Sequence, residues 1–104
     1  KRKNEIMFGL EDRHINFILS ILKNNFSGAK FYIFGSRAKG TYKEYSDIDI
    51  AVDLNNKKLD TDILGRILIE FQDSTLPYEV DVIDINSIDE KFKNLIQDSL
   101  VELK

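Results

Sequence analysis

Apolar residues return at helical spacing in three segments of the chain, residues 11–25, 60–73 and 88–101. In each segment they recur every three or four positions, which places them along one face of a helix. These faces consist of Ile15, Ile18, Leu19 and Leu22 in the first segment, Ile63, Ile67, Leu68 and Phe71 in the second, and Phe92, Leu95, Ile96 and Leu100 in the third. We therefore predict three amphipathic helices whose apolar faces pack into the core.

Between these segments the pattern changes to short runs and alternation, which are typical of strands. Residues 31–34 form an aromatic and β-branched run that stops at Gly35, and residues 36–40 predict a short helical turn. Residues 48–54 and 79–85 alternate apolar positions with acidic or small ones. The order α-β-α-β-α-β-α predicts an α/β (α+β) fold, with a three-stranded, mixed sheet packed by helices. The order of the strands within the sheet stays open.

The composition is that of one globular domain. A chain of 104 residues supports one modest core and has no linker-like stretch, so we place a single domain over residues 1–104, with Lys1 to Lys3 as a frayed end. The chain has no cysteine, which excludes disulfides and thiolate metal sites. No apolar run reaches membrane-spanning length and no signal peptide is evident, so we expect a cytoplasmic protein. The net charge of −3 argues against direct nucleic-acid binding but does not exclude a nucleotide.

Carboxylates occupy one side of two predicted strands. Asp47 and Asp49 point the same way because side chains alternate along a strand. Asp81 points away from Val80 and Val82, so it meets that pair if the two strands are neighbours. Three converging carboxylates repel one another unless a cation neutralises them, and hard oxygen ligands suit Mg²⁺. The pattern therefore predicts that Asp47, Asp49 and Asp81 are metal ligands.

A phosphate-binding turn is predicted where the first strand ends. Gly35 permits a tight turn and a close approach of an anion to the backbone. Ser36 can cap the short helix that follows or donate its hydroxyl to a phosphate. Arg37 and Lys39 add positive charge that can reach a phosphate or remain solvated, and Gly40 suits the turn after the helix.

Some residues and one motif are not assigned to the candidate site. Asp53 and Asp84 are expected to be solvated residues of an acidic strand face, and His14 a surface or capping residue. The segment from Gly35 to Gly40 has the outer glycines of a Walker A loop, but Thr41 stands where the required lysine belongs. The chain is therefore not expected to contain a P-loop.

These motifs resemble those of the DNA polymerase β-type nucleotidyltransferase superfamily. Phe34-Gly35-Ser36, ten further residues and then Asp47-Ile48-Asp49-Ile50 match its signature, and Val80-Asp81-Val82 falls where the superfamily carries its third carboxylate. The longer string from Gly35 to Val52 is similar to the minimal nucleotidyltransferases, or MNT proteins. The resemblance implies a polymerase β-like core, two Mg²⁺ ions held by the three aspartates, and a triphosphate seated on Gly35 and Ser36 and helped by Arg37 and Lys39.

The resemblance also implies a partner. MNT proteins are often encoded beside a helical HEPN-type protein as toxin–antitoxin pairs, so we expect an antitoxin that transfers AMP from ATP to a tyrosine of a HEPN-type toxin in a hetero-oligomer. One alternative is a nucleotidyltransferase for a small molecule such as an aminoglycoside, with its substrate domain supplied in trans. The other is an antitoxin that neutralises its toxin by binding alone.

Overall fold

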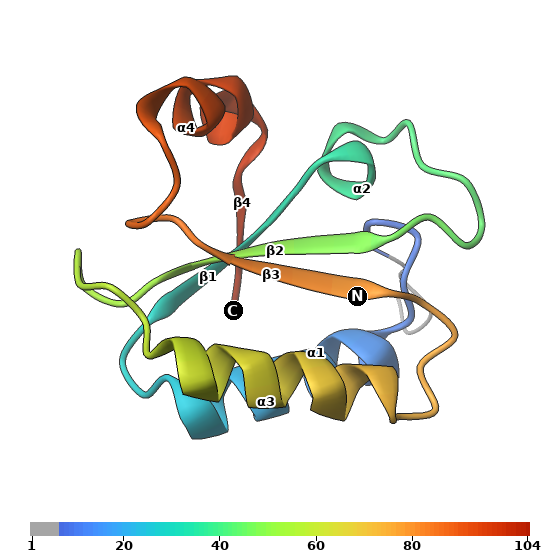
Figure 1. The fold of residues 1–104 in the computed structure, drawn as a ribbon. Helices are drawn as coiled ribbons and strands as arrows, with labels where there is room; N and C mark the ends of the chain where they lie inside the picture. Colours follow the sequence, from blue (N-terminus) through green and yellow to red (C-terminus); the bar gives the residue numbers. More distant parts are fainter. Residues whose placement is uncertain (1–6) are drawn as a thin grey trace.

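The computed structural model describes residues 7–104 as one mixed sheet with helices on both faces (Figure 1). The expected frayed end at Lys1 to Lys3 lies outside the described residues. The helices are α1 (Asp12–Asn25), α2 (Ser36–Lys39), α3 (Thr61–Gln72), α4 (Glu90–Ile96) and the 3-10 helix η1 (Gln97–Ser99). The strands are β1 (Lys30–Phe34), β2 (Ile48–Asp53), β3 (Val80–Asp84) and β4 (Val101–Leu103). No helix within residues 7–104 is long and apolar enough to cross a membrane.

The sheet has the strand order β3-β2-β1-β4. Strand β1 pairs antiparallel with both β2 and β4, whereas β2 and β3 run parallel, so the predicted mixed sheet is confirmed. The register sets Phe34 opposite Asp49, and Asp49 opposite Asp81. The two acidic strands are therefore neighbours, as the convergence of their carboxylates requires.

The fourth strand corrects the predicted count of three. Residues 88–101 were expected to form one closing helix, but the helical backbone ends at Ser99 and Leu100 is extended, with φ −68° and ψ 126°. Val101 and Leu103 then pair with Ile33 and Phe31 along the outer edge of β1. A continued helix would have left this edge unpaired, whereas β4 satisfies its backbone groups and buries Leu103.

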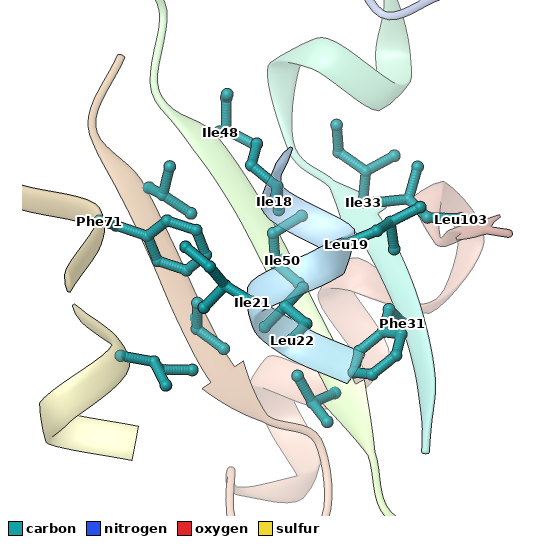
Figure 2. Close-up of a cluster of buried hydrophobic side chains, with 14 of the residues drawn as sticks. Ile18, Leu19, Ile21, Leu22, Phe31, Ile33, Ile48, Ile50, Phe71 and Leu103 are labelled. Atoms are coloured by element: carbon teal, nitrogen blue, oxygen red, sulfur yellow. The ribbon is translucent and has the colours of Figure 1, made fainter. Parts of the chain in front are cut away.

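The main core lies between the sheet and the two long helices, α1 and α3. Ile18, Leu19, Ile21 and Leu22 of α1 pack with Phe71 of α3 against one face of the sheet (Figure 2). The strands contribute their alternate residues to this layer, which are Phe31, Ile33, Ile48, Ile50, Val52, Val80, Val82 and Leu103. The side chain of Asp60 fixes the start of α3, because it accepts hydrogen bonds from the backbone N–H groups of Asp62 and Ile63.

The opposite face of the sheet carries α4 and a smaller core. Phe34, Ala51, Ile85 and Ile96 are its buried members, and α2 and α4 lie together above this face in Figure 1. Leu95 was expected to belong to the apolar face of the last helix, but 71% of it is exposed. Helix α4 has only seven residues and covers one end of the sheet, so it buries Ile96 and leaves Leu95 in solvent. The carboxylates of β2 and β3 share this partly covered face.

Candidate nucleotidyl-transfer site

The three candidate aspartates lie where β2 and β3 begin. Asp49 and Asp81 are adjacent across the parallel pair, and both lie on the face opposite the main core, because their neighbours Ile48, Ile50, Val80 and Val82 all belong to that core. Asp47 immediately precedes β2. Asp49 is half-buried, whereas Asp47 and Asp81 are exposed. The fold therefore brings these three carboxylates to one end of one sheet face.

The carboxylates interact electrostatically. Burial raises the pKa of Asp49 above its ordinary value, and the nearby charges of Asp81 and then Asp47 raise it further. The ionised form of Asp49 is therefore disfavoured in the protein alone. A cation placed among the three groups would reverse this effect.

Gly35 places the predicted phosphate-binding turn beside the three candidate carboxylates. Its backbone has φ 76° and ψ −153°, a conformation that is essentially restricted to glycine. A Cβ atom at this position would lie 2.5 Å from Oδ2 of Asp49. The turn after β1 therefore approaches the central carboxylate as closely as a residue without a side chain allows.

Helix α2 begins directly after this turn, with Gly35 as its N-cap and half-buried Ser36 as its first residue. No side chain caps this helix, so the expected capping by the Ser36 hydroxyl is not observed within the described chain. Lys39 is exposed at the other end of α2 and lines a hollow of about 400 Å³ with residues of α4, η1 and β4. Among residues 7–104, no hydrogen bond or ion pair fixes its side chain beside Gly35.

The side chain of Arg37 is buried away from the candidate site around Gly35 and Asp49. Only 1% of Arg37 is exposed, and its guanidinium lies over the rings of Tyr42 and Tyr78, 5.1 and 4.8 Å from their centroids. It donates hydrogen bonds to the backbone carbonyl oxygens of Ser46 (3.0 and 2.9 Å), Glu44 (3.1 Å) and Phe8 (2.9 Å). Each of the three guanidinium nitrogens therefore donates to a backbone carbonyl oxygen rather than to a phosphate.

The contacts of Arg37 support the loop that presents Asp47. Ser46 accepts hydrogen bonds from the guanidinium through its carbonyl oxygen, and its hydroxyl accepts one from the backbone N–H of Lys43 at 2.7 Å. The residue before Asp47 is therefore held from two sides. Sequence reasoning did not identify Tyr42 and Tyr78, because nothing in their immediate sequence marks them as partners of a buried cation.

Two aspartates that were expected to be solvated are structural. Only 7% of Asp84 is exposed, and it accepts hydrogen bonds from Leu59 N (2.8 Å), Asn86 N (3.0 Å) and Ser87 Oγ (2.6 Å). Asp53 accepts hydrogen bonds from the backbone N–H of Asn56 and from the Asn86 amide, which together lower its pKa. These bonds secure the loops at the far end of β2 and β3, away from the three candidate ligands.

His14 also differs from the expected surface role. Its ring packs edge-on against Tyr78, with 5.5 Å between the centroids, and its buried Nδ1 atom has no hydrogen-bond partner among the described residues. His14 therefore packs against one of the two tyrosine rings that contact Arg37.

The donor set fits Mg²⁺ as a metal shared with a substrate. Within residues 7–104, no group of three or more His, Cys, Asp or Glu side chains is arranged to hold a metal ion by itself. Mg²⁺ in phosphate-transferring sites is usually bound by one or two carboxylates together with substrate phosphates and water, so a complete protein cage is not required. The raised pKa of Asp49 beside Asp81 indicates carboxylates that a cation would stabilise.

Comparison with known proteins identifies the family of the chain. Residues 15–103 match the model of the nucleotidyltransferase domain. The chain therefore belongs to the nucleotidyltransferase domain family and is a nucleotidyltransferase, which confirms the family that its motifs indicated.

The relatives of the chain include a probable protein adenylyltransferase and proteins of toxin–antitoxin pairs. The chain is 31% identical over 88 residues to the probable protein adenylyltransferase MntA of Haemophilus influenzae, covering 85% of this chain and 76% of that protein. A crystal structure of a toxin–antitoxin with AMP-PNP is 32% identical, with a TM-score of 0.63 over 75% of this chain and 62% of the other. A complex of tri-AMPylated Shewanella oneidensis HEPN toxin with MNT antitoxin is 25% identical, with a TM-score of 0.68 over 88% and 70%.

Proposed function

We propose that this chain transfers AMP from ATP to a tyrosine hydroxyl of a HEPN-type toxin, and so acts as the antitoxin in a hetero-oligomeric pair. The observation that supports the proposal most is the meeting of Gly35, Asp49 and Asp81 on three neighbouring parts of the fold. The relatives add support, since one is a probable protein adenylyltransferase and another is an MNT antitoxin bound to an AMPylated HEPN toxin. The proposal includes a cytoplasmic site of action, where ATP is available.

In this proposal Asp47, Asp49 and Asp81 are the catalytic metal ligands, and the backbone at Gly35 and Ser36 holds the phosphates. Two bound Mg²⁺ ions would supply charge neutralisation and polarisation of the attacking and leaving oxygens. Lys39 is the cation that can swing to the phosphates. Arg37 is assigned to holding the Asp47 loop and not to the nucleotide, because its guanidinium is enclosed.

The transfer requires little covalent help from the protein. The tyrosine oxygen forms a bond to the α-phosphorus of ATP while the bond from that phosphorus to the bridging oxygen of the β-phosphate breaks. Pyrophosphate leaves with the electron pair of that bond. The phenolic proton passes to Asp81, whose exposed position suits contact with an incoming acceptor, and then to water.

Intact-mass spectrometry of the HEPN-type partner tests this function. The partner is incubated with ATP, Mg²⁺ and the chain, and the Asp47→Ala/Asp49→Ala double variant serves as the control. We expect the added mass of AMP with the native chain and none with the double variant or with EDTA. If the partner gains no mass while the double variant still neutralises its toxicity, the chain acts by binding alone. Transfer of AMP to an added aminoglycoside instead would indicate a small-molecule enzyme.

A further inference from the structure

A groove lies at the start of the edge strand β3 and reaches Asp81 of the candidate site. It has a volume of about 430 Å³ and lies between the end of α3, the loop of residues 73–79 and the start of β3. Gln72 lines it from α3, Tyr78 from the loop, and Glu79 and Asp81 from the strand. We call this hollow the β3-edge groove. Because Asp81 lines the groove, a molecule bound there lies next to the three candidate aspartates.

The strand beside the groove has unpaired backbone groups. Strand β3 is at the end of the order β3-β2-β1-β4, and within residues 7–104 no further strand pairs with its outer side. The hydrogen bonds from Ile48 N to Glu79 O and from Ile85 N to Val52 O show that odd-numbered residues of β3 direct their backbone towards β2. In a parallel ladder the alternate residues then face away, so the N–H and C=O groups of Val80 and Val82 point outwards. An extended peptide segment could pair with them.

The residues that line the groove determine which peptide side chains would complement it. Among residues 7–104, the charged residues that line the groove are Glu79 and Asp81, which are both acidic, and no Lys, Arg or His of this part of the chain lines it. The other contacts are mostly apolar and come from Leu68, Phe71, Leu76, Pro77 and Val80. A segment with apolar and basic side chains therefore complements the groove, whereas an acidic one would be repelled.

We infer that the β3-edge groove binds an extended, basic and apolar segment of the protein substrate and directs the acceptor tyrosine of that segment to Asp81. This inference rests on the proposed function and adds the surface that recognises the acceptor. It explains how a catalytic group on an edge strand receives a side chain from another protein, since the peptide would continue the sheet by one strand.

A binding experiment can use the absence of cysteine from the chain. Gln72→Cys, in the groove, is labelled with an environment-sensitive dye, and Asn24→Cys, on the exposed end of α1, is the matched control. Each is titrated with the peptide Arg-Val-Tyr-Val-Arg and with its acidic counterpart Glu-Val-Tyr-Val-Glu. We expect the basic peptide to change the emission at residue 72 only, to bind roughly tenfold more tightly than the acidic one, and to be released by salt. Equal binding of both peptides, equal responses at both dye positions or no response would overturn the inference.

A transfer assay separates failure of the groove from failure of the proposed function. Gln72→Lys adds a positive charge to the groove, and Asn24→Lys adds the same charge elsewhere. With the HEPN-type partner as acceptor, we expect Gln72→Lys to raise the KM for the partner several-fold and to leave the KM for ATP unchanged, while Asn24→Lys changes neither. Unchanged kinetics for both variants would refute the groove and leave the function standing. Peptide binding at residue 72 without any AMP transfer would instead refute the function and leave the groove as a binding site.

Discussion

A single Cβ atom added at Gly35 would collide with Asp49 and change the geometry of the candidate site. We predict that Gly35→Ala destabilises the protein, because its backbone conformation costs a non-glycine residue about 1–3 kcal/mol and its new Cβ would lie 2.5 Å from Asp49 Oδ2. Chemical denaturation measures this loss, and nucleotide binding in the presence of Mg²⁺ should weaken in parallel because Asp49 is displaced.

Gly40→Ala is the matched control for this change. Gly40 also has a positive φ, 83°, but a Cβ there would meet no atom within 4 Å. We expect a loss of about 1 kcal/mol from backbone strain alone, with little effect on nucleotide binding. Equal effects of both substitutions on nucleotide binding would show that contact with Asp49 is unimportant.

The raised pKa of Asp49 gives a second prediction at this scale. A carboxylate whose folded-state pKa is raised binds its proton more tightly in the folded than in the unfolded state, so its contribution to stability is favourable at low pH and is lost as pH rises through the folded pKa. In EDTA at pH 7, Asp49→Asn should therefore raise the melting temperature by a few degrees. The gain should shrink towards pH 3, where the native residue is protonated.

Added Mg²⁺ provides the control for this electrostatic effect. It should stabilise the native chain, because a cation relieves the repulsion among the three carboxylates, and should stabilise Asp49→Asn less. A variant that is less stable than the native chain at neutral pH without metal would contradict this account of Asp49.

At the scale of elements, Arg37 joins α2 to the loop that precedes β2. We predict that Arg37→Lys costs about 1.5–3 kcal/mol of stability, because an ammonium group cannot reproduce the fork of hydrogen bonds to Ser46, Glu44 and Phe8. Urea denaturation measures the loss, and AMP transfer should fall because Asp47 is no longer held. Arg66→Lys, on the exposed side of α3, should change stability by less than about 0.5 kcal/mol.

Helix α4 offers a comparison between two adjacent residues. Ile96 is buried against the sheet, so Ile96→Ala should cost about 2–5 kcal/mol through lost packing and a cavity. Leu95→Ala should change stability by less than about 0.5 kcal/mol, since 71% of Leu95 is exposed. Thermal unfolding of both variants checks this pair. A large loss from Leu95→Ala would mean that the helix is rotated relative to the structure described above.

At the scale of the whole molecule, the sequence predicts most of the fold. The helices α1 and α3 and the three longer strands follow from periodicity, because each element is long enough to repeat its pattern. The alternation of Val80 and Val82 with Asp81 likewise assigned Asp81 to the face opposite the core. Strand β4 was not predictable, since Val101–Leu103 is too short to alternate and its partner, the edge of β1, lies about 70 residues earlier.

The candidate site was predicted less evenly. The positions of Asp47, Asp49 and Gly35 follow from strand period and turn chemistry, and their roles in catalysis remain predictions. Arg37 was not predictable as a buried residue, because a solvated arginine and an enclosed one look alike in a sequence. Only the folded chain places the carbonyl oxygens of Phe8, Glu44 and Ser46 around it.

The pairing of Phe31 with Leu103 also has a consequence for synthesis on the ribosome. Strand β1 emerges early, but its outer edge cannot be covered until translation has passed Leu103. Until then the growing chain exposes an apolar, unpaired strand edge, the kind of surface that invites pairing with other unfinished chains. Molecules halted before Leu103 would keep the three carboxylates but lack this cover, so the synthesis of β4 decides whether a nascent chain can pair with its neighbours on the same messenger RNA.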